Sequence, residues 1–215
     1  MRTIDICGDI VDDYSGHIYD RYNYPCTYPK KVKDILAGVA ENEDVEININ
    51  SGGGDVFAGY EIYTAILTHK GNVQINVTGL AASAASVIMC AGKSRISPVG
   101  MVMVHCCSVW ASGNHAELEK TADTLKTIDE SIANAYVAKT GMEKAKALEL
   151  MEKTTWLTAD KAVELGLCDG YIERVNTSGK QSDGTPTDRT PKNDKTAAAK
   201  AKARFLTMRG EMRNV

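Results

Sequence analysis

Two segments rich in serine, glycine and alanine, 29 positions apart, contain the residues best suited to chemistry. Residues 50–55 read Asn-Ser-Gly-Gly-Gly-Asp, and residues 79–86 read Gly-Leu-Ala-Ala-Ser-Ala-Ala-Ser. Each segment follows a short β-prone run and precedes an apolar helical pattern. Strand-to-helix turns of this kind bring backbone N–H groups and a hydroxyl close to a bound carbonyl. They therefore favour hydrolysis of an acyl compound.

Ser83 and His105 are the candidate nucleophile and general base. Ser83 begins an alanine-rich helical pattern, and His105 ends the apolar run 101–104, at the carboxyl end of an expected strand. A serine attacks a carbonyl well only when a base takes its proton and donors receive the oxyanion. Taken singly, Ser83 is more simply explained as a helix N-cap and His105 as a structural or surface histidine. Ser86 is expected to face the protein interior.

Gly53, Gly54 and the amide of Ala84 are the candidate oxyanion donors. Consecutive glycines permit backbone conformations that point N–H groups into a cavity, although a plain flexible turn has the same composition. A phosphate-binding loop would need a Gly-Lys-Ser/Thr ending, whereas Asp55 follows here and repels phosphate. Acyl transfer is therefore favoured over phosphate binding.

The elements around these segments alternate between strand and helix, which predicts a mostly parallel α/β sheet. Strands are expected at residues 3–8, 45–49, 73–77, 101–105 and 167–172. Helices are expected at residues 29–38, 59–69, 84–91, 141–153 and 160–165, with Thr158 as the N-cap of the last.

A longer helix is expected over residues 115–139, because apolar residues recur there at steps of three and four. Two explanations of this stripe are open, namely burial within the same chain and a contact between subunits. The stripe consists of Leu118, Ala122, Leu125, Ile128, Ile132 and Tyr136.

Composition limits the function classes. The 215 residues allow one domain with a substantial core and an appendage. We expect no membrane association and no secretory leader, because no apolar run has the required length or pattern. The six cysteines and four histidines lack metal-site spacing, so no metal is expected. Buried free thiols favour a reducing, cytoplasmic compartment.

Charge divides the chain into two regions. Residues 1–173 carry a net charge of −9, and residues 174–215 carry +6. We expect a folded domain over 1–173, a flexible linker over 174–196 and a basic, partly helical tail over 197–215. The tail lacks the aromatic interleaving of nucleic-acid-binding segments, so no nucleic-acid partner is expected.

Four segments, in order along the chain, resemble the Clp protease proteolytic subunit family. Residues 49–59 resemble its Ser-Pro-Gly-Gly segment, and residues 79–83 resemble its Gly-Gln-Ala-Ala-Ser nucleophile turn. Residues 103–105 are similar to its Met-Ile-His base, and residues 156–167 to its closing helix segment. The resemblance spans about residues 3–173.

This resemblance implies a Clp protease/crotonase-type α/β fold, in which repeated β-β-α turns form a spiral core and residues 115–139 form a projecting handle helix. It implies homo-oligomeric rings that hydrolyse a peptide or protein substrate without a metal or organic cofactor. His105 would deprotonate Ser83, and the amides of Gly54 and Ala84 would hold the oxyanion.

Two positions depart from the family's pattern. Gly52 stands where the family has proline, and Thr154 stands where it has the aspartate of the catalytic triad. A threonine hydroxyl can accept the histidine N–H but has no charge to stabilise an imidazolium. Glu152 is the nearest carboxylate in sequence that could substitute. We therefore expect a Ser–His pair of reduced efficiency, with Thr154 as its third member.

The short core and basic tail resemble the Clp-like proteases of tailed phages and prophages more than the housekeeping enzyme. This implies maturation of a capsid or scaffold protein in the host cytoplasm, with the tail as a substrate or a tether. Two alternatives stay open. One is a catalytically weak, ring-forming assembly factor, which Thr154 favours; the other is a crotonase-type acyl-CoA hydratase or isomerase, whose usual carboxylates are missing here.

Overall fold

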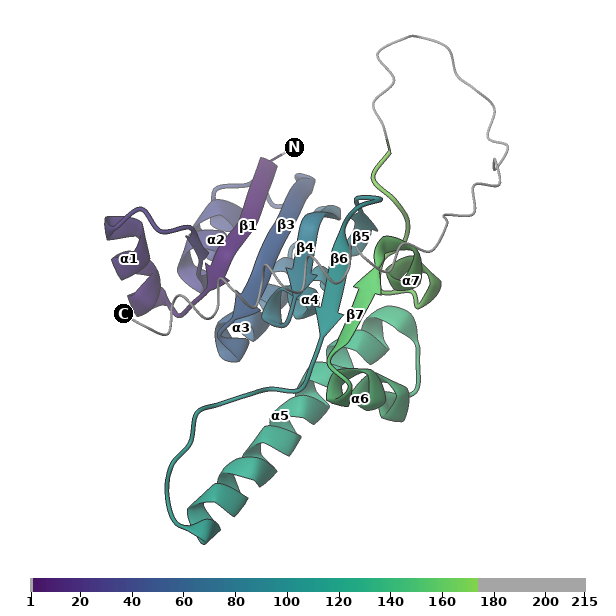
Figure 1. The fold of residues 1–215 in the computed structure, drawn as a ribbon. Helices are drawn as coiled ribbons and strands as arrows, with labels where there is room; N and C mark the ends of the chain where they lie inside the picture. The colour runs from purple at the N-terminus through teal and green to yellow at the C-terminus, as the bar shows by residue number, and fades with distance from the viewer. Residues whose placement is uncertain (1, 174–215) are drawn as a thin grey trace. The chain divides into compact units, whose positions relative to one another are not determined.

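A seven-stranded sheet forms the centre of residues 2–173, the part of the chain that this computed structural model describes (Figure 1). Its order is β2-β1-β3-β4-β6-β7, and β5 pairs with β4. Neighbouring strands are parallel except for β6 and β7, which are antiparallel. The strands are β1 (Arg2–Ile10), β2 (Cys26–Thr27), β3 (Val45–Gly54), β4 (Val73–Ala82), β5 (Lys93–Ile96), β6 (Met101–Val104) and β7 (Thr155–Thr158).

Helices connect the parallel strands, and α2, α3 and α4 lie side by side against one face of the sheet (Figure 1). Right-handed crossovers place these connections on one face, because the strand order β1-β3-β4-β6 follows the chain. The helices are α1 (Asp13–Arg21), α2 (Pro29–Ala37), α3 (Val56–Leu67), α4 (Ala84–Met89), α5 (His115–Thr140), α6 (Lys144–Glu152) and α7 (Ala159–Glu164).

The core is built mainly from β-branched aliphatic side chains. In β3 the side chains of Val45, Ile47 and Ile49 are fully buried, while the polar residues between them are half-buried. Strands with helices on one face show this alternation of period two. The mostly parallel α/β sheet predicted from the sequence is confirmed.

The expected helix at 29–38 is confirmed as α2, which has Pro29 at its first turn and Gly38 as its C-cap. Thr158 is confirmed as the N-cap of α7, since its hydroxyl accepts the Lys161 N–H. Both ends were recognisable because capping depends on local sequence.

Helix α5 extends away from the sheet (Figure 1). Asn114 and Glu117 form a capping box at its start, and Gly141 ends it with φ 73°. The chain itself buries one end of the apolar stripe and leaves the other end exposed. Ile132 and Tyr136 are buried within the chain, whereas Leu118, near the projecting end, is exposed.

The expected strand at 167–172 is wrong. The N–H groups of Leu167 and Cys168 both donate to Ala162 O and close the end of α7, so they are not available for a ladder. A single bridge between Ile96 and Tyr171 forms instead.

The glycine segment is not the turn that its composition predicts. β3 continues through it, with Gly54 paired to Ile10 of β1, and the turn begins only at Asp55. The Asp55 side chain accepts the Ala58 N–H and so caps α3. The glycines are therefore held against neighbouring strands.

The sequence did not predict α1, β2, β5 or β7. Among the described residues, no helix is long and apolar enough to cross a membrane. The expected linker at 174–196 and basic tail at 197–215 lie outside the described residues.

Candidate active site

Ser83 connects β4 to α4 in a conformation that is rare for a residue with a side chain, with φ 55° and ψ −127°. Its side chain makes no capping hydrogen bond to α4, so the simpler explanation of Ser83 as a side-chain N-cap is wrong. Instead, Ser83 Oγ lies 2.8 Å from Nε2 of His105. The turn directs the hydroxyl at the histidine.

Strand pairing explains why two residues 22 positions apart meet. β4 and β6 are parallel neighbours in which Ala82 pairs with Met103, so both strands end at the same edge of the sheet. Ser83 follows Ala82 directly and donates its N–H to Met103 O at 2.9 Å. His105 lies two residues beyond Met103 and is partly buried. Ser83 and His105 therefore meet at the edge of the sheet where β4 and β6 end.

Gly53 packs directly against the serine turn, with φ 92°. A Cβ atom there would lie 2.6 Å from both Ala82 O and Ser83 Cβ, so no larger residue fits. Its N–H donates to Ser51 Oγ at 3.1 Å and is thus already engaged. Of the three candidate donors, the structure leaves Gly54 and Ala84 as the better ones.

Two polar residues that the sequence did not single out shape this edge. The buried Ser51 hydroxyl donates to Gly8 O at 2.7 Å while it accepts the Gly53 N–H. Asn50 Oδ1 accepts the Leu80 N–H at 3.1 Å and so ties β3 to β4. Their position directly after the strand expected at 45–49 was the indication that the sequence offered.

Thr154 directly precedes β7, and His105 directly follows β6, the strand with which β7 pairs. The β6–β7 ladder ends with the pair Val104 and Thr155, and the Thr154 N–H donates to Met151 O at 2.9 Å, outside the ladder. Thr154 is exposed, with φ 49°. Within residues 2–173, no hydrogen bond joins its hydroxyl to His105, and the Glu152 carboxylate is likewise exposed.

Asp129 of α5 is a carboxylate near the site that the sequence did not reveal. Its Oδ1 accepts the Cys107 N–H at 2.6 Å, two residues after His105. Burial, together with the Asp129 charge, raises the pKa of the Cys106 thiol to about 11, so that thiol is protonated at neutral pH. Asp129 is separated from residues 105–107 by over 20 positions, and only the folded chain brings them together.

No group of three or more histidine, cysteine, aspartate or glutamate side chains in the described part of the chain could hold a metal. The arrangement offers a hydroxyl, an imidazole and backbone N–H groups at one edge of the sheet. Together these groups can carry out acyl transfer through a serine nucleophile.

The sequence model of the Clp protease family matches residues 31–175. The ATP-dependent Clp protease proteolytic subunit of Bacteroides fragilis is 32% identical to this chain over 175 residues, which is 80% of each chain. Subunit 1 from Chlamydia abortus is 33% identical over 60% of this chain and 69% of its own. The subunit from Deinococcus radiodurans is 29% identical over 68% of this chain and 74% of its own.

This chain belongs to the Clp protease family. The expected membership and the Clp protease fold are thereby confirmed. Clp proteases are serine-type peptidases that act on protein substrates and form homo-oligomeric rings, so the chain is a serine endopeptidase. The alternative of an acyl-CoA hydratase or isomerase has no support from these relatives.

Proposed function

We propose that this Clp family endopeptidase cleaves peptide bonds with Ser83 as nucleophile, His105 as general base and an oxyanion site built from backbone amides. The observation that carries the proposal is the 2.8 Å contact between Ser83 Oγ and His105 Nε2. A nucleophile and its base need this distance for direct proton transfer.

The reaction follows from the chemistry of these two groups. With the imidazole proton on Nδ1, Nε2 takes the Ser83 proton while Oγ bonds to the scissile carbonyl carbon. The C–N bond then breaks, and the leaving amine takes the proton from His105. Water, deprotonated by the same nitrogen, hydrolyses the acyl-enzyme and restores Ser83.

Gly54 and Ala84 are the amides best placed to hold the oxyanion. Ala84 is the first residue of α4, where the N–H groups lack partners within the helix. Consecutive amides of an extended strand point to opposite edges, and the Asp55 N–H donates to Ile10 O of β1. The Gly54 N–H is then directed towards β4 and the serine turn. Gly53, which has no side chain, leaves room for the serine turn.

Thr154 is the third member in this proposal, because it directly precedes β7, whose pairing with β6 places Thr155 opposite Val104, the neighbour of His105. A threonine hydroxyl that turns to accept the imidazole N–H would orient the ring but would not stabilise its protonated form. Catalysis of reduced efficiency is the consequence, and a catalytically weak assembly factor is the limiting case.

For the biological role we propose maturation of a phage capsid or scaffold protein, with the basic tail at 197–215 as a substrate or tether. The resemblance of the short core and basic tail to phage-encoded Clp-like proteases supports this role. The names of the curated relatives, which are subunits of ATP-dependent proteases, favour a second candidate. In that case an ATPase partner delivers unfolded substrates.

The test compares wild type with the variants Ser83→Ala and Ser112→Ala, the latter being a control in an exposed loop. Cleavage of a fluorogenic peptide and labelling by a fluorophosphonate probe should be lost only in Ser83→Ala. Intact-mass measurement shows in parallel whether the tail is removed. Equal peptide cleavage by wild type and Ser83→Ala would overturn the serine mechanism.

A further inference from the structure

We propose that α5 positions both catalytic residues, through Tyr136 at the serine turn and Asp129 at the segment that follows His105. This inference rests on the proposed roles of Ser83 and His105. It makes Tyr136 and Asp129 positioning residues, since neither needs to touch the substrate.

The strained conformation of Ser83 must be held by its surroundings, because isolated residues rarely adopt it. The Ser83 N–H is fixed by Met103 O at 2.9 Å. The Ser83 C=O accepts two hydrogen bonds from one residue, from Ser86 N at 2.9 Å and from Ser86 Oγ at 2.6 Å. The Ser86 hydroxyl therefore helps to hold Ser83 in its conformation.

Tyr136 is a hydrogen-bond partner of the Ser86 hydroxyl. Its oxygen lies 2.8 Å from Ser86 Oγ, and both side chains are buried. Ser86 has one hydroxyl proton and gives it to Ser83 C=O, so Tyr136 must donate to Ser86. Burial raises the pKa of Tyr136, which keeps this donor protonated across the working pH range. The result is a series of hydrogen bonds that runs from Tyr136 through Ser86 to Ser83.

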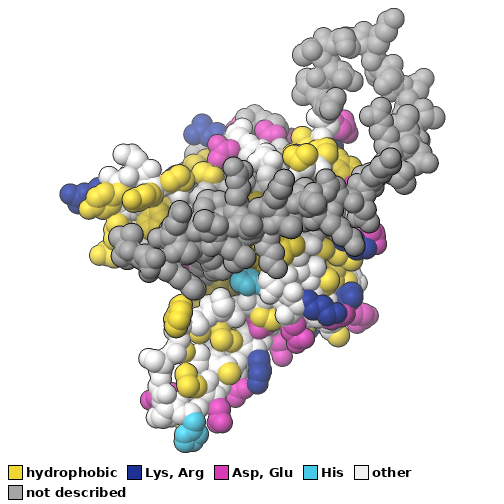
Figure 2. Space-filling view, viewed as in Figure 1, with side chains coloured by type: hydrophobic (Ala, Val, Ile, Leu, Met, Phe, Trp, Pro, Cys, Tyr) yellow, Lys and Arg dark blue, Asp and Glu magenta, His cyan; other side chains and the backbone are white. Residues whose placement is uncertain are grey.

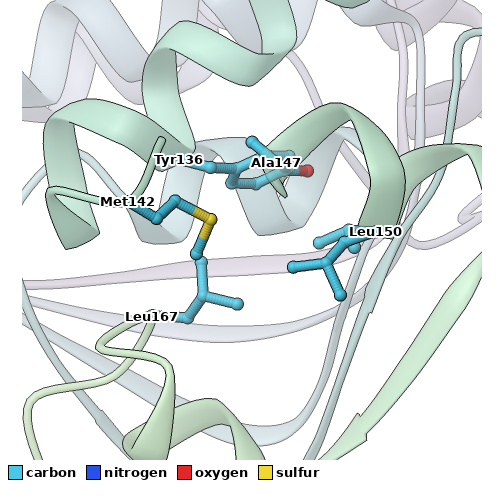
Figure 3. Close-up of a pocket in the computed structure, with 6 residues that line it drawn as sticks. Tyr136, Met142, Ala147, Leu150 and Leu167 are labelled. Carbon is cyan, nitrogen blue, oxygen red and sulfur yellow. The ribbon is translucent and has the colours of Figure 1, made fainter. Parts of the chain in front are cut away.

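Apolar packing fixes the position of the Tyr136 side chain. It lines a small apolar pocket with Met142, Ala147, Leu150 and Leu167 (Figure 3). Close packing restricts the ring to one orientation, so its hydroxyl is delivered to one place. Ser86 is thereby aligned by a group whose own position is set by α5, α6 and the segment after α7.

Asp129 performs the equivalent task for the base. Its carboxylate accepts the Cys107 N–H at 2.6 Å and fixes the chain just beyond His105. Asp129 and Tyr136 are seven residues apart, two turns of a helix, and therefore lie on the same face of α5. Directly before Asp129, Ile128 O accepts a hydrogen bond from the Tyr60 hydroxyl at 3.2 Å, which holds α5 to α3.

The first experiment measures kcat and KM for Tyr136→Phe, Ser86→Ala and the double variant, with Tyr28→Phe as a control. The Tyr28 hydroxyl donates to Asp20 and makes no hydrogen bond to Ser83, Ser86 or His105 in the described residues, so Tyr28→Phe should keep wild-type kinetics. Tyr136→Phe should lower kcat about tenfold or less at unchanged KM, the scale of one net hydrogen bond. Ser86→Ala should be more damaging.

The two effects should not add, because both variants break one chain of hydrogen bonds. The double variant should therefore be no slower than Ser86→Ala alone. Additive losses, or an unchanged kcat in Tyr136→Phe at wild-type melting temperature, would overturn the role of Tyr136.

The second experiment compares Asp129→Ala with Asp129→Asn. If Asp129 acts by accepting the Cys107 N–H, asparagine restores most of the kcat that alanine loses, since its carbonyl oxygen is also an acceptor. Asp123→Ala, on the exposed surface of the same helix, is the matched control. Equal losses in both Asp129 variants would contradict positioning through this hydrogen bond.

These outcomes separate the inference from the function on which it rests. A wild-type protein that neither cleaves peptide nor reacts with the fluorophosphonate refutes the proposed function. A wild-type protein that does both, with Tyr136→Phe and Asp129→Ala unaffected, refutes only the inference.

Discussion

At the scale of single residues, the site depends on one backbone conformation that the surrounding chain enforces. Non-glycine residues in sparsely populated regions cost roughly 1–3 kcal/mol, and Ser83 is in such a region with φ 55°. In this conformation its hydroxyl lies 2.8 Å from His105 Nε2. Gly53 has to be glycine because the turn occupies the space of its Cβ.

Gly53→Ala should therefore lower kcat/KM by at least about 100-fold, the loss expected when catalytic groups are misplaced by about 1 Å. The added methyl would meet Ala82 O and Ser83 Cβ, each at 2.6 Å. Peptide hydrolysis by the purified variant measures the effect. Gly170→Ala is the matched control, because nothing lies within 4 Å of that site. Full activity in Gly53→Ala would show that the serine turn can shift without cost.

If Thr154 is the third member, Thr154→Asp should raise kcat at least about tenfold, because a carboxylate that accepts the His105 N–H stabilises the imidazolium that forms during attack. Aspartate also tolerates the φ of 49° at this position better than a β-branched threonine. The measurement is kcat in wild type and Thr154→Asp, with Thr154→Asn as the uncharged control. An unchanged or lower kcat in Thr154→Asp means that another group orients His105.

The contact between Ser83 and His105 was predictable from the sequence, whereas their supporting residues were not. Each of these two residues follows a β-prone run, and the ends of parallel strands share one edge. Asp129 and Tyr136 belong to a helical pattern that predicts an apolar face but not what that face touches. The contacts of Asp129 with Cys107 and of Tyr136 with Ser86 depend on the docking of α5, which no local pattern specifies.

At the scale of elements, strong periodicity was easier to interpret than short or irregular segments. α5 and α2 were foreseen because their stripes and caps are local features. α1 was missed because it contains Gly16 and several polar residues and packs only through one side. β5 and β7 have four residues each, too few for a reliable alternation.

An ion pair joins α5 to the segment after α7 and predicts acid sensitivity. Lys139 Nζ, on a side chain only 8% exposed, lies 2.5 Å from Asp169 Oδ2 and also donates to Gly92 O. Burial opposes ionisation of Asp169, but Lys139 and the Ser94 N–H outweigh it and lower its pKa below 3.8. A lowered pKa stabilises the fold above pH 3.8, and this contribution disappears as pH falls through the folded-state value.

Asp169→Asn should reduce the free energy of unfolding at pH 7 by about 1–2 kcal/mol, a modest value because the carboxylate is partly exposed. Urea unfolding of wild type and variant between pH 7 and pH 3 gives the comparison. The difference should shrink towards zero at the acid end. Asp123→Asn, in an exposed pair with Lys126, should show little difference throughout. A difference at Asp169 that is constant with pH would exclude the ion pair as its cause.

At the scale of the whole molecule, the projecting half of α5 is largely exposed within the described part of the chain. Hydrophobic side chains are visible along this projection among acidic and basic ones (Figure 2). Leu118, on the same stripe as the buried Ile132, is 42% exposed, and Val109 in the preceding loop is 58% exposed. An apolar stripe that continues beyond the folded core is typical of a contact between subunits. Clp proteases form rings, and we predict that this surface contacts another subunit.

Leu118→Glu should therefore reduce the size of the assembly, because it places a charge within the apolar stripe that would be buried between subunits. The assembly mass is measured by size-exclusion chromatography with light scattering, at several protein concentrations. Thr127→Glu adds the same charge to the same helix at an exposed position on the side away from the stripe, and should leave the mass unchanged. Since Leu118 lies far along α5 from Tyr136, the variant should keep its melting behaviour. A wild-type mass for Leu118→Glu would mean that the stripe is not the subunit contact, and an equal loss in both variants would assign the effect to charge alone.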